Sequence, residues 1–339
     1  MNRKRLVAFI GVLLVLALGF LFRGQIKSAF DGIGKDYPGP GFGAASITIS
    51  SGEDGTSVAK DLVAAGVVKD YGYTYKLMIS RNQTFLPGTF DLLKQMKAAD
   101  ALDRLQNPHF LAVNHVTVKE GLRIGQVFKV LGAATGIPVA DFEAVTLRQM
   151  GLSTKLPSLE GYLFPATYDF AKNATARDVL KTMVDRMSEE LDSFGVPASK
   201  RHAVLTLASI IQKEARLPDD FYKVSRVFTN RLTIGMHLQS DATVSYGSGG
   251  TTVTTTDAER ANPNLYNTYV HAGLPVGPIS APGNRAIDAA LHPTKGSWLY
   301  FCAINLKTGE TVFSTTIAEH EAAVRQWRAW MAANPGWNG

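Results

Sequence analysis

Cysteine is almost absent from this sequence, and the cysteine and histidine patterns exclude several kinds of site. Cys302 is the single cysteine among 339 residues, so no intrachain disulfide can form. The apolar run around it, residues 298–303, predicts a small side chain in a buried strand. The seven histidines include no His-x-x-x-His pair and no Cys-x-x-Cys occurs. The sequence therefore predicts no metal site.

Motifs of three common enzyme classes are also missing. There is no Gly-x-Ser-x-Gly elbow, no glycine-rich phosphate loop followed by Lys-Ser or Lys-Thr, and no Gly-x-Gly-x-x-Gly fingerprint. These absences disfavour an elbow-type serine hydrolase, a P-loop nucleotidase and a dinucleotide-binding enzyme. We therefore expect no cofactor and look for chemistry in the side chains alone.

Dense positive charge is confined to the N-terminus. The formal net charge is +6, but beyond Arg3–Arg5 the lysines and arginines are scattered along the chain. A scattered excess disfavours nucleic acid as a partner and suits an anionic membrane surface or cell-wall polymer.

A long apolar run directly follows this charged cluster. Residues 6–22 contain no charged side chain and end at Arg23. They predict a transmembrane helix, with residues 1–5 in the cytoplasm because the denser positive cluster precedes the run. A cleaved signal peptide is the alternative, but no small-residue cleavage site precedes Arg23. The rest of a single-pass chain then lies outside the cytoplasm.

Proline and glycine separate this helix from the folded part of the chain. They are concentrated within residues 37–43, so residues 23–45 are expected to be a linker. Residues 46–150 predict a small α+β module, because a strand, a glycine turn and an amphipathic helix occur at 47–65 and again at 116–132.

Within this module, the segment Thr117–Ile137 resembles the LysM peptidoglycan-binding pattern. Residues 151–339 predict a larger α+β domain with several helices and a C-terminal hairpin. The expected fold class is therefore α+β throughout, with the larger domain following the smaller one.

One carboxylate lies on the apolar face of the helix predicted over residues 205–214. At about 100° per residue, Leu207, Ile210 and Ile211 form one stripe, and Glu214 points along it. Such a carboxylate is paired, at the edge of the core, or in a cleft. For this helix alone, a rim glutamate with a structural partner is the simpler interpretation.

Carboxylate chemistry on a sugar is the reaction class that this placement favours. Burial beside Ile210 and Ile211 would raise the pKa of Glu214 and preserve the proton that a glycosidic oxygen needs. Taken singly, each downstream aromatic is more often a packing residue than a platform for a sugar ring. The side chains that suit sugar hydroxyls and ring faces are Gln239, Tyr246, Tyr266, Asn267 and Tyr269.

Several long motifs, in one order, resemble the YceG-like family. They occur at Leu159–Tyr168, Ala208–Glu214, Val227–Leu232, Gly235–Gly247 and Tyr266–Ile279. The resemblance covers roughly residues 46–327. Members are membrane-anchored endolytic murein transglycosylases of bacteria. The resemblance therefore implies an enzyme at the bacterial inner or plasma membrane, with a YceG-like catalytic domain over residues 151–339 outside the cytoplasm.

The resemblance also implies roles for particular residues. The family's catalytic acid closes the Ala-Ser-Ile-Ile-x-Lys-Glu motif, which places it at Glu214. The variable position, often Glu in the family, is Gln212 here, and Ser240 stands where the family usually has Thr. The matching motifs add Glu160, Ser240 and Asp241 to the expected substrate-binding or positioning residues.

The implied reaction breaks the bond between MurNAc and GlcNAc in nascent glycan strands. The MurNAc 6-hydroxyl closes on C1 and leaves a 1,6-anhydroMurNAc end, which would terminate glycan elongation. Penicillin-binding peptidoglycan synthases are the implied partners. Two alternatives stay open at this point. One is a muramidase-type hydrolase that pairs Glu214 with Asp241 or Glu160, and the other is a non-catalytic peptidoglycan-binding scaffold.

Overall fold

A computed structural model of the chain describes residues 34–250 and 255–335. None of the helices in these ranges is long and apolar enough to span a bilayer. The transmembrane helix predicted at residues 6–22 lies outside the described residues.

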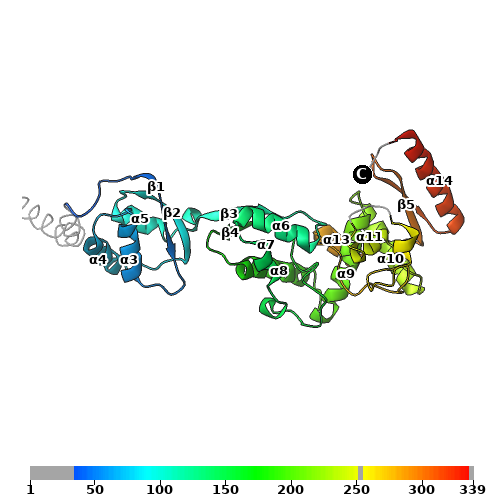
Figure 1. Ribbon diagram of the computed structural model, residues 1–339, viewed down its shortest axis with the longest axis horizontal. Coiled ribbons are helices and arrows are strands. Elements are labelled where there is room, and N and C mark those ends of the chain that lie inside the picture. Colours follow the sequence, from blue (N-terminus) through cyan, green and yellow to red (C-terminus); the bar gives the residue numbers. More distant parts are fainter. Residues whose placement is uncertain (1–33, 251–254, 336–339) are drawn as a thin grey trace, which may run out of the picture. The chain divides into compact units, whose positions relative to one another are not determined.

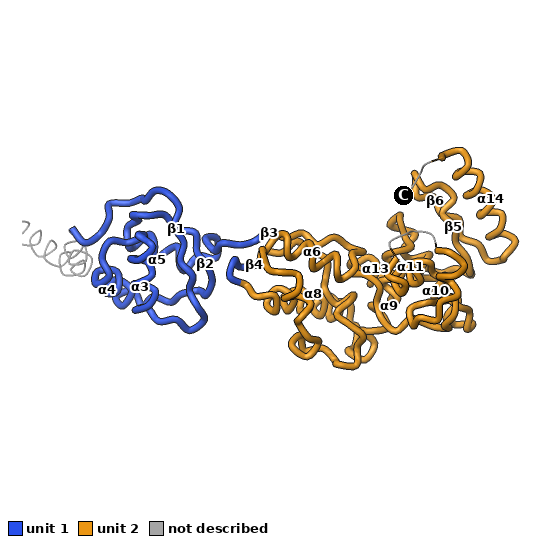
Figure 2. Tube along the Cα trace, in the orientation of Figure 1, with its two compact units in different colours: residues 1–114, 171–173 blue, residues 115–170, 174–339 orange. Residues whose placement is uncertain are grey.

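The chain forms two compact units, shown in different colours in Figure 2. Unit 1 comprises residues 1–114 and 171–173, and unit 2 comprises residues 115–170 and 174–339. The division at residue 114 differs from the predicted boundary at residue 150. The strand that begins at Val113 pairs with a strand that begins at Thr167. Sequence periodicity does not encode such a long-range pairing, so it could not place this boundary.

Unit 1 combines an antiparallel strand pair with helices. Strand β1 begins at Phe42, so the expected linker over residues 23–45 ends a few residues too late. Ile47, Phe90 and Leu92 point into a core that also contains Leu62 and Leu102. The elements, in chain order, are β1 (Phe42–Ile49), α3 (Gly55–Ala64), α4 (Tyr71–Ser80), β2 (Gly88–Lys94), α5 (Ala98–Arg104) and the 3-10 turn η1 (Pro108–Phe110).

Unit 2 is predominantly helical, with two small sheets (Figure 1). Its elements, in chain order, are β3 (Val113–Thr117), α6 (Ile124–Thr135), α7 (Val139–Glu143), the 3-10 turn η2 (Arg148–Met150), β4 (Thr167–Ala171), α8 (Ala176–Ser193), α9 (Ala198–Glu214), α10 (Asp220–Thr233), α11 (Asp241–Gly247), α12 (Asp257–Arg260), α13 (Asn284–Leu291), β5 (Tyr300–Asn305), β6 (Glu310–Ser314) and α14 (Ile317–Ala333).

The predicted α+β class is confirmed, as are the C-terminal hairpin and terminal helix. Strands β5 and β6 pair antiparallel, and Cys302 lies in β5 as expected, although its side chain is half-buried and not fully buried. Both segments of the predicted repeat contain a strand followed by a helix, β1 with α3 and β3 with α6, and the two strands belong to separate sheets because β1 pairs with β2 whereas β3 pairs with β4. The LysM-like segment 117–137 lies in unit 2, whereas the first strand and helix of the predicted repeat, β1 and α3, lie in unit 1.

Helix α9 is the central element of the second half of unit 2. Helices α10, α11 and α13 all contact it, and Figure 1 shows them around it. Every residue from Leu205 to Ile211 is buried. The expectation of a single apolar stripe is therefore wrong. Its polar residues enter the core because Thr206 donates to the carbonyl of His202 and Ser209 donates to the carbonyl of Thr206.

The burial of α9 predicts a large difference between two substitutions in the same helix. Ile210 is fully buried, so Ile210→Ala should lower the free energy of unfolding by about 2–5 kcal/mol. Lys200 is exposed, so Lys200→Ala should change it by about 0.5 kcal/mol or less. Urea denaturation followed by circular dichroism measures both. Similar losses for the two variants would contradict the described packing.

Candidate active site

Glu214 is the last residue of α9 and is only partly exposed. The Ser240 hydroxyl donates to its Oε1 over 2.5 Å, and the backbone N–H of Ala242 also donates to the carboxyl group. Among the described residues, no ion pair includes Glu214. The structural partners expected of a rim glutamate are therefore a serine hydroxyl and a backbone N–H.

Glu214 opens into a cavity of about 390 Å³. A cavity of this size can hold part of a sugar chain, since small-molecule sites are typically about 300–1,000 Å³. Its walls come from the end of α9, from α10, from the segment before α11, and from the C-terminal hairpin and helix. The lining residues are Glu214, Arg231, Leu238, Gln239, Asp241, Tyr269, Tyr300, Phe301, Ile317 and His320.

The surroundings of Glu214 favour its protonated form. Burial raises the pKa of the carboxyl group, and the negative charge of Asp241 raises it further. The hydrogen bonds from Ser240 and Ala242 and the charge of Lys213 act in the opposite direction without cancelling the effect. A carboxyl group with a raised pKa that faces a cavity can donate a proton to a bound ligand.

Ser240 is held in place by the loop that contains Thr268. The Ser240 N–H donates to the Thr268 hydroxyl over 3.1 Å, and the Gln239 N–H donates to the Thr268 carbonyl over 3.1 Å. Thr243 bonds the same Thr268 hydroxyl over 2.8 Å. Gln239 is exposed at the cavity with a φ of 48°, a left-handed conformation that is uncommon outside glycine. This loop therefore fixes the segment that carries the hydrogen-bond donor to Glu214.

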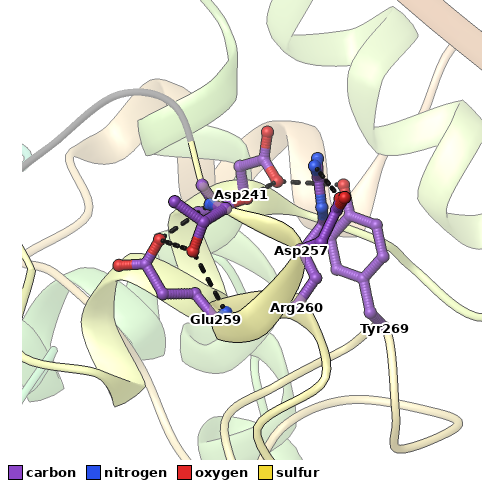
Figure 3. Close-up of polar contacts among 7 residues, drawn as sticks. Asp241, Asp257, Glu259, Arg260 and Tyr269 are labelled. Atoms are coloured by element: carbon purple, nitrogen blue, oxygen red, sulfur yellow. Dashed lines mark hydrogen bonds and ion pairs between the residues drawn. The ribbon is translucent and has the colours of Figure 1, made fainter.

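Asp241 lies in the same cavity but is already engaged. Its Oδ1 accepts from the Thr255 hydroxyl over 2.5 Å and from the Tyr269 hydroxyl over 2.9 Å. Figure 3 shows Asp241 and Tyr269 beside Arg260, whose guanidinium lies 5.8 Å from the Tyr269 ring centroid. Asp257 accepts a hydrogen bond from Arg260 over 2.8 Å. Asp241 is thus a fixed negative charge near Glu214.

Arg231 forms part of the cavity wall and was not anticipated as a site residue. It is buried, and its guanidinium donates to the carbonyls of Leu299 over 2.6 Å and Leu238 over 2.7 Å. These bonds join α10 to the approach to β5 and to the segment before α11. Nothing in its immediate sequence signals this role, because both carbonyls come from other elements.

Glu160, Tyr246 and Tyr266 form a second cluster that does not line the Glu214 cavity. Glu160 is 2% exposed, and its oxygens accept from the Ile124 N–H at 3.0 and 3.1 Å. Burial raises the pKa of Glu160 to about 7, although the Ile124 and Tyr246 hydrogen bonds and the charge of Arg123 act to lower it. The Tyr246 and Tyr266 rings are 4.7 Å apart. The predicted site residues therefore divide into two groups.

The expectation that Asn267 binds substrate is not supported by its position. The residue is fully buried, and its side-chain nitrogen donates to the carbonyls of Glu259, Arg260 and Asn262. Its side-chain oxygen accepts from the Tyr269 N–H over 2.9 Å. With both polar atoms used inside the protein, Asn267 shapes the loop instead of facing the cavity.

The described residues contain no cluster of three or more histidine, cysteine, aspartate or glutamate side chains that could hold a metal ion. The described residues that line the cavity provide a protonatable carboxyl group, hydrogen-bonding side chains and aromatic rings. This set of groups can carry out acid–base chemistry on a polar ligand.

Comparison with known proteins gives consistent results. A protein from Bacillus subtilis (strain 168) named endolytic murein transglycosylase is 32% identical over 308 residues, which cover 83% of this chain and 84% of that protein. A Streptococcus pneumoniae (serotype 2, strain D39) protein of the same name is 26% identical over 320 residues, and the match spans 83% of this chain and 58% of that longer protein.

The fold is also found in a solved structure. The 2.6 Å crystal structure of a yceG-like protein from Listeria monocytogenes matches with a TM-score of 0.55 and 29% identity, covering 83% of this chain and 99% of that one. The family model described as the YceG-like family matches residues 47–326, which include parts of both compact units and all the residues that line the cavity around Glu214. The chain therefore belongs to the YceG-like family.

Proposed function

We propose that this protein is an endolytic murein transglycosylase, a lyase that cuts peptidoglycan glycan strands with Glu214 as its acid. The observation that carries the proposal is the raised pKa of Glu214 at the wall of a cavity of about 390 Å³. Family membership and the names of the B. subtilis and S. pneumoniae relatives support the same reaction.

The reaction can be followed at the carboxyl group of Glu214. The protonated carboxyl donates to the oxygen between MurNAc and GlcNAc, and the bond from that oxygen to C1 of MurNAc breaks. The MurNAc 6-hydroxyl then bonds to C1 and loses its proton to the Glu214 carboxylate. The products are a free GlcNAc hydroxyl and a 1,6-anhydroMurNAc end. Glu214 is protonated again, and no water is consumed.

The geometry favours this reaction over muramidase-type hydrolysis. Two-carboxylate hydrolases place the groups about 5–9.5 Å apart on either side of the sugar, so that the second activates water or attacks C1. Here Glu160 is buried outside the cavity, and Oδ1 of Asp241 already accepts two hydroxyl groups. A non-catalytic scaffold would have no need for a carboxyl group with a raised pKa at the wall of a cavity.

We further propose an extracytoplasmic location and a wall-binding role for unit 1. The apolar run at residues 6–22 supports a single-pass anchor in the plasma membrane. In unit 1, a groove of about 640 Å³ contains Asp54, Tyr75, Ile79 and Asn82, a mixture that suits a sugar chain. Family resemblance supports penicillin-binding synthases as partners and termination of nascent glycan strands as the cellular role.

The Glu214→Gln variant tests the catalytic assignment. Loss of the transferable proton should lower the rate of glycan cleavage at least about 10²–10⁴-fold. Uncrosslinked nascent glycan is digested, and its ends are identified by mass spectrometry. Wild-type protein should leave 1,6-anhydro ends, and Glu143→Gln, an exposed residue of α7, should behave like wild type. Anhydro ends from Glu214→Gln, or reducing ends from wild type, would contradict the proposal.

The Ser240→Ala variant tests how the pKa of Glu214 is set. The Ser240 hydrogen bond lowers that pKa, so its removal should raise it further. Because the acid form is the active one, activity falls as pH rises through the pKa. The alkaline limb of the kcat profile should therefore move to higher pH in Ser240→Ala. The control Ser199→Ala, on the exposed start of α9, should leave it in place. A shift to lower pH would refute this explanation.

Removal of the apolar run tests the membrane anchor. A chain that begins at residue 24 should leave the membrane fraction on cell lysis, whereas the full chain should remain there.

The groove of unit 1 is tested by a charged substitution. In the Glu214→Gln background, Ile79→Glu should weaken binding to isolated peptidoglycan about 10-fold, because it places a charge in the groove. Ile79 is 66% exposed, so the fold should tolerate it, and the matched control is Ile234→Glu, at 62% exposure in unit 2. Equal binding by both variants would exclude the groove.

A further inference from the structure

The cavity beside Glu214 has a wall that the motif comparison did not identify. Tyr300 and Phe301 come from β5, whereas Ile317 and His320 come from the first turns of α14. Both elements belong to unit 2 and pack against each other. A ligand that reaches Glu214 through this cavity would also meet the C-terminal hairpin and helix.

His320 is held within this wall by an aromatic stack. Its ring lies 5.2 Å from the Tyr300 ring centroid, with an angle of 21° between the planes. The Arg231 guanidinium is 5.3 Å from the same Tyr300 centroid, and its own donors are bound to backbone carbonyls. The stack leaves the His320 ring little freedom to rotate, so the atoms that it presents to the cavity are fixed.

One of the two ring nitrogens of His320 is already excluded from ligand contact. Nδ1 is buried and has no hydrogen-bond partner among the described residues. An unpaired N–H in that position would cost more than an unpaired lone pair, so the favoured tautomer has its proton on Nε2. Any ring nitrogen that contacts a ligand in the cavity must then be Nε2, and it does so as a donor.

The electrostatic surroundings keep this ring neutral. Burial lowers the pKa of His320, and the positive charge of Arg231 lowers it further, with Glu321 acting weakly in the opposite direction. A neutral ring that offers a single N–H does not compete with Glu214 for the role of acid. It suits recognition of an uncharged acceptor, such as a sugar hydroxyl or an acetamido carbonyl oxygen.

We propose that His320 is a substrate-binding residue that donates a hydrogen bond from Nε2 to an oxygen of the sugar beside Glu214. Tyr300 and Ile317 supply apolar surface for the sugar ring on the same wall. The inference rests on the proposed function, because it assumes that a glycan strand occupies this cavity. It assigns to the C-terminal helix a direct part in holding the substrate.

Three substitutions at one position test the donor. His320→Ala removes it and should lower kcat/KM on uncrosslinked glycan about 10- to 100-fold. His320→Gln retains an N–H near the position of Nε2 without a titratable ring, and should remain within about 3-fold of wild type. His320→Phe fills the same space without a donor and should resemble His320→Ala, which keeps the comparison usable if His320→Ala does not fold. Arg325→Ala, exposed on α14, is the matched control.

Binding is measured separately from turnover. Calorimetry in the Glu214→Gln background, with a purified GlcNAc–MurNAc oligosaccharide, should show about 10-fold weaker binding when His320→Phe is added. Unchanged binding and turnover in both His320→Ala and His320→Phe would overturn the inference. A folded His320→Gln variant as impaired as His320→Phe would also overturn it, since proton transfer would then be the role of His320.

The same measurements separate this inference from the proposed function. If wild-type protein left no 1,6-anhydro ends, the proposed function would fail, and the calorimetric comparison would still decide whether His320 binds the sugar. If anhydro ends form and depend on Glu214 while His320→Phe binds and cleaves normally, only the assignment of His320 fails.

Discussion

The cost of ionising Glu214 is the constraint on which the catalytic unit depends. The residue ends a helix in which every residue from Leu205 to Ile211 is buried, so its carboxyl group lies at the boundary between the core and the cavity. Burial and Asp241 both penalise the carboxylate, whereas Ser240 and Ala242 stabilise it through hydrogen bonds. The opposing contributions leave the pKa of this carboxyl group raised, while the two hydrogen bonds favour its carboxylate form.

Glu160 and Glu214 are two carboxyl groups of unit 2 that lie in different surroundings. Glu160 and Glu214 both have raised pKa values because of burial. Glu160 accepts from the Ile124 N–H at the start of α6 and lies outside the cavity. Glu214 lines the cavity and receives only a hydroxyl and one backbone N–H. A raised pKa alone would not distinguish the two, whereas access to the cavity does.

The sequence predicts the local features of this molecule better than its long-range ones. The α+β class, the hairpin, the terminal helix and the helix that ends at Glu214 all follow from periodicity and turn residues. The single apolar stripe was wrong because Thr206 and Ser209 satisfy their hydroxyl groups within α9 and can be buried. The unit boundary was misplaced because the pairing of β3 with β4 joins segments fifty residues apart.

The candidate site shows the same difference between local features, which the sequence predicts, and long-range ones, which it does not. Of the predicted site residues, Glu214, Gln239, Asp241 and Tyr269 line one cavity, and Ser240 bonds Glu214 there. Asn267 has its side chain bonded inside the loop. The sequence did not predict that His320 lines this cavity, because only the tertiary fold brings the terminal helix to the end of α9. The motifs therefore point to Glu214 at the end of α9, but not to the cavity wall formed by the C-terminal elements.

The protonation state of Glu214 tests this account most directly. Infrared difference spectra between wild type and Glu214→Gln, recorded across a pH titration, isolate the carbonyl stretch of this protonated carboxyl group. The account predicts that the signal persists well above the pH at which an ordinary glutamate, with a pKa of about 4.3, has ionised. Loss of the signal at or below that pH would show that burial does not protect the proton, and Glu214 could not then be the acid described here.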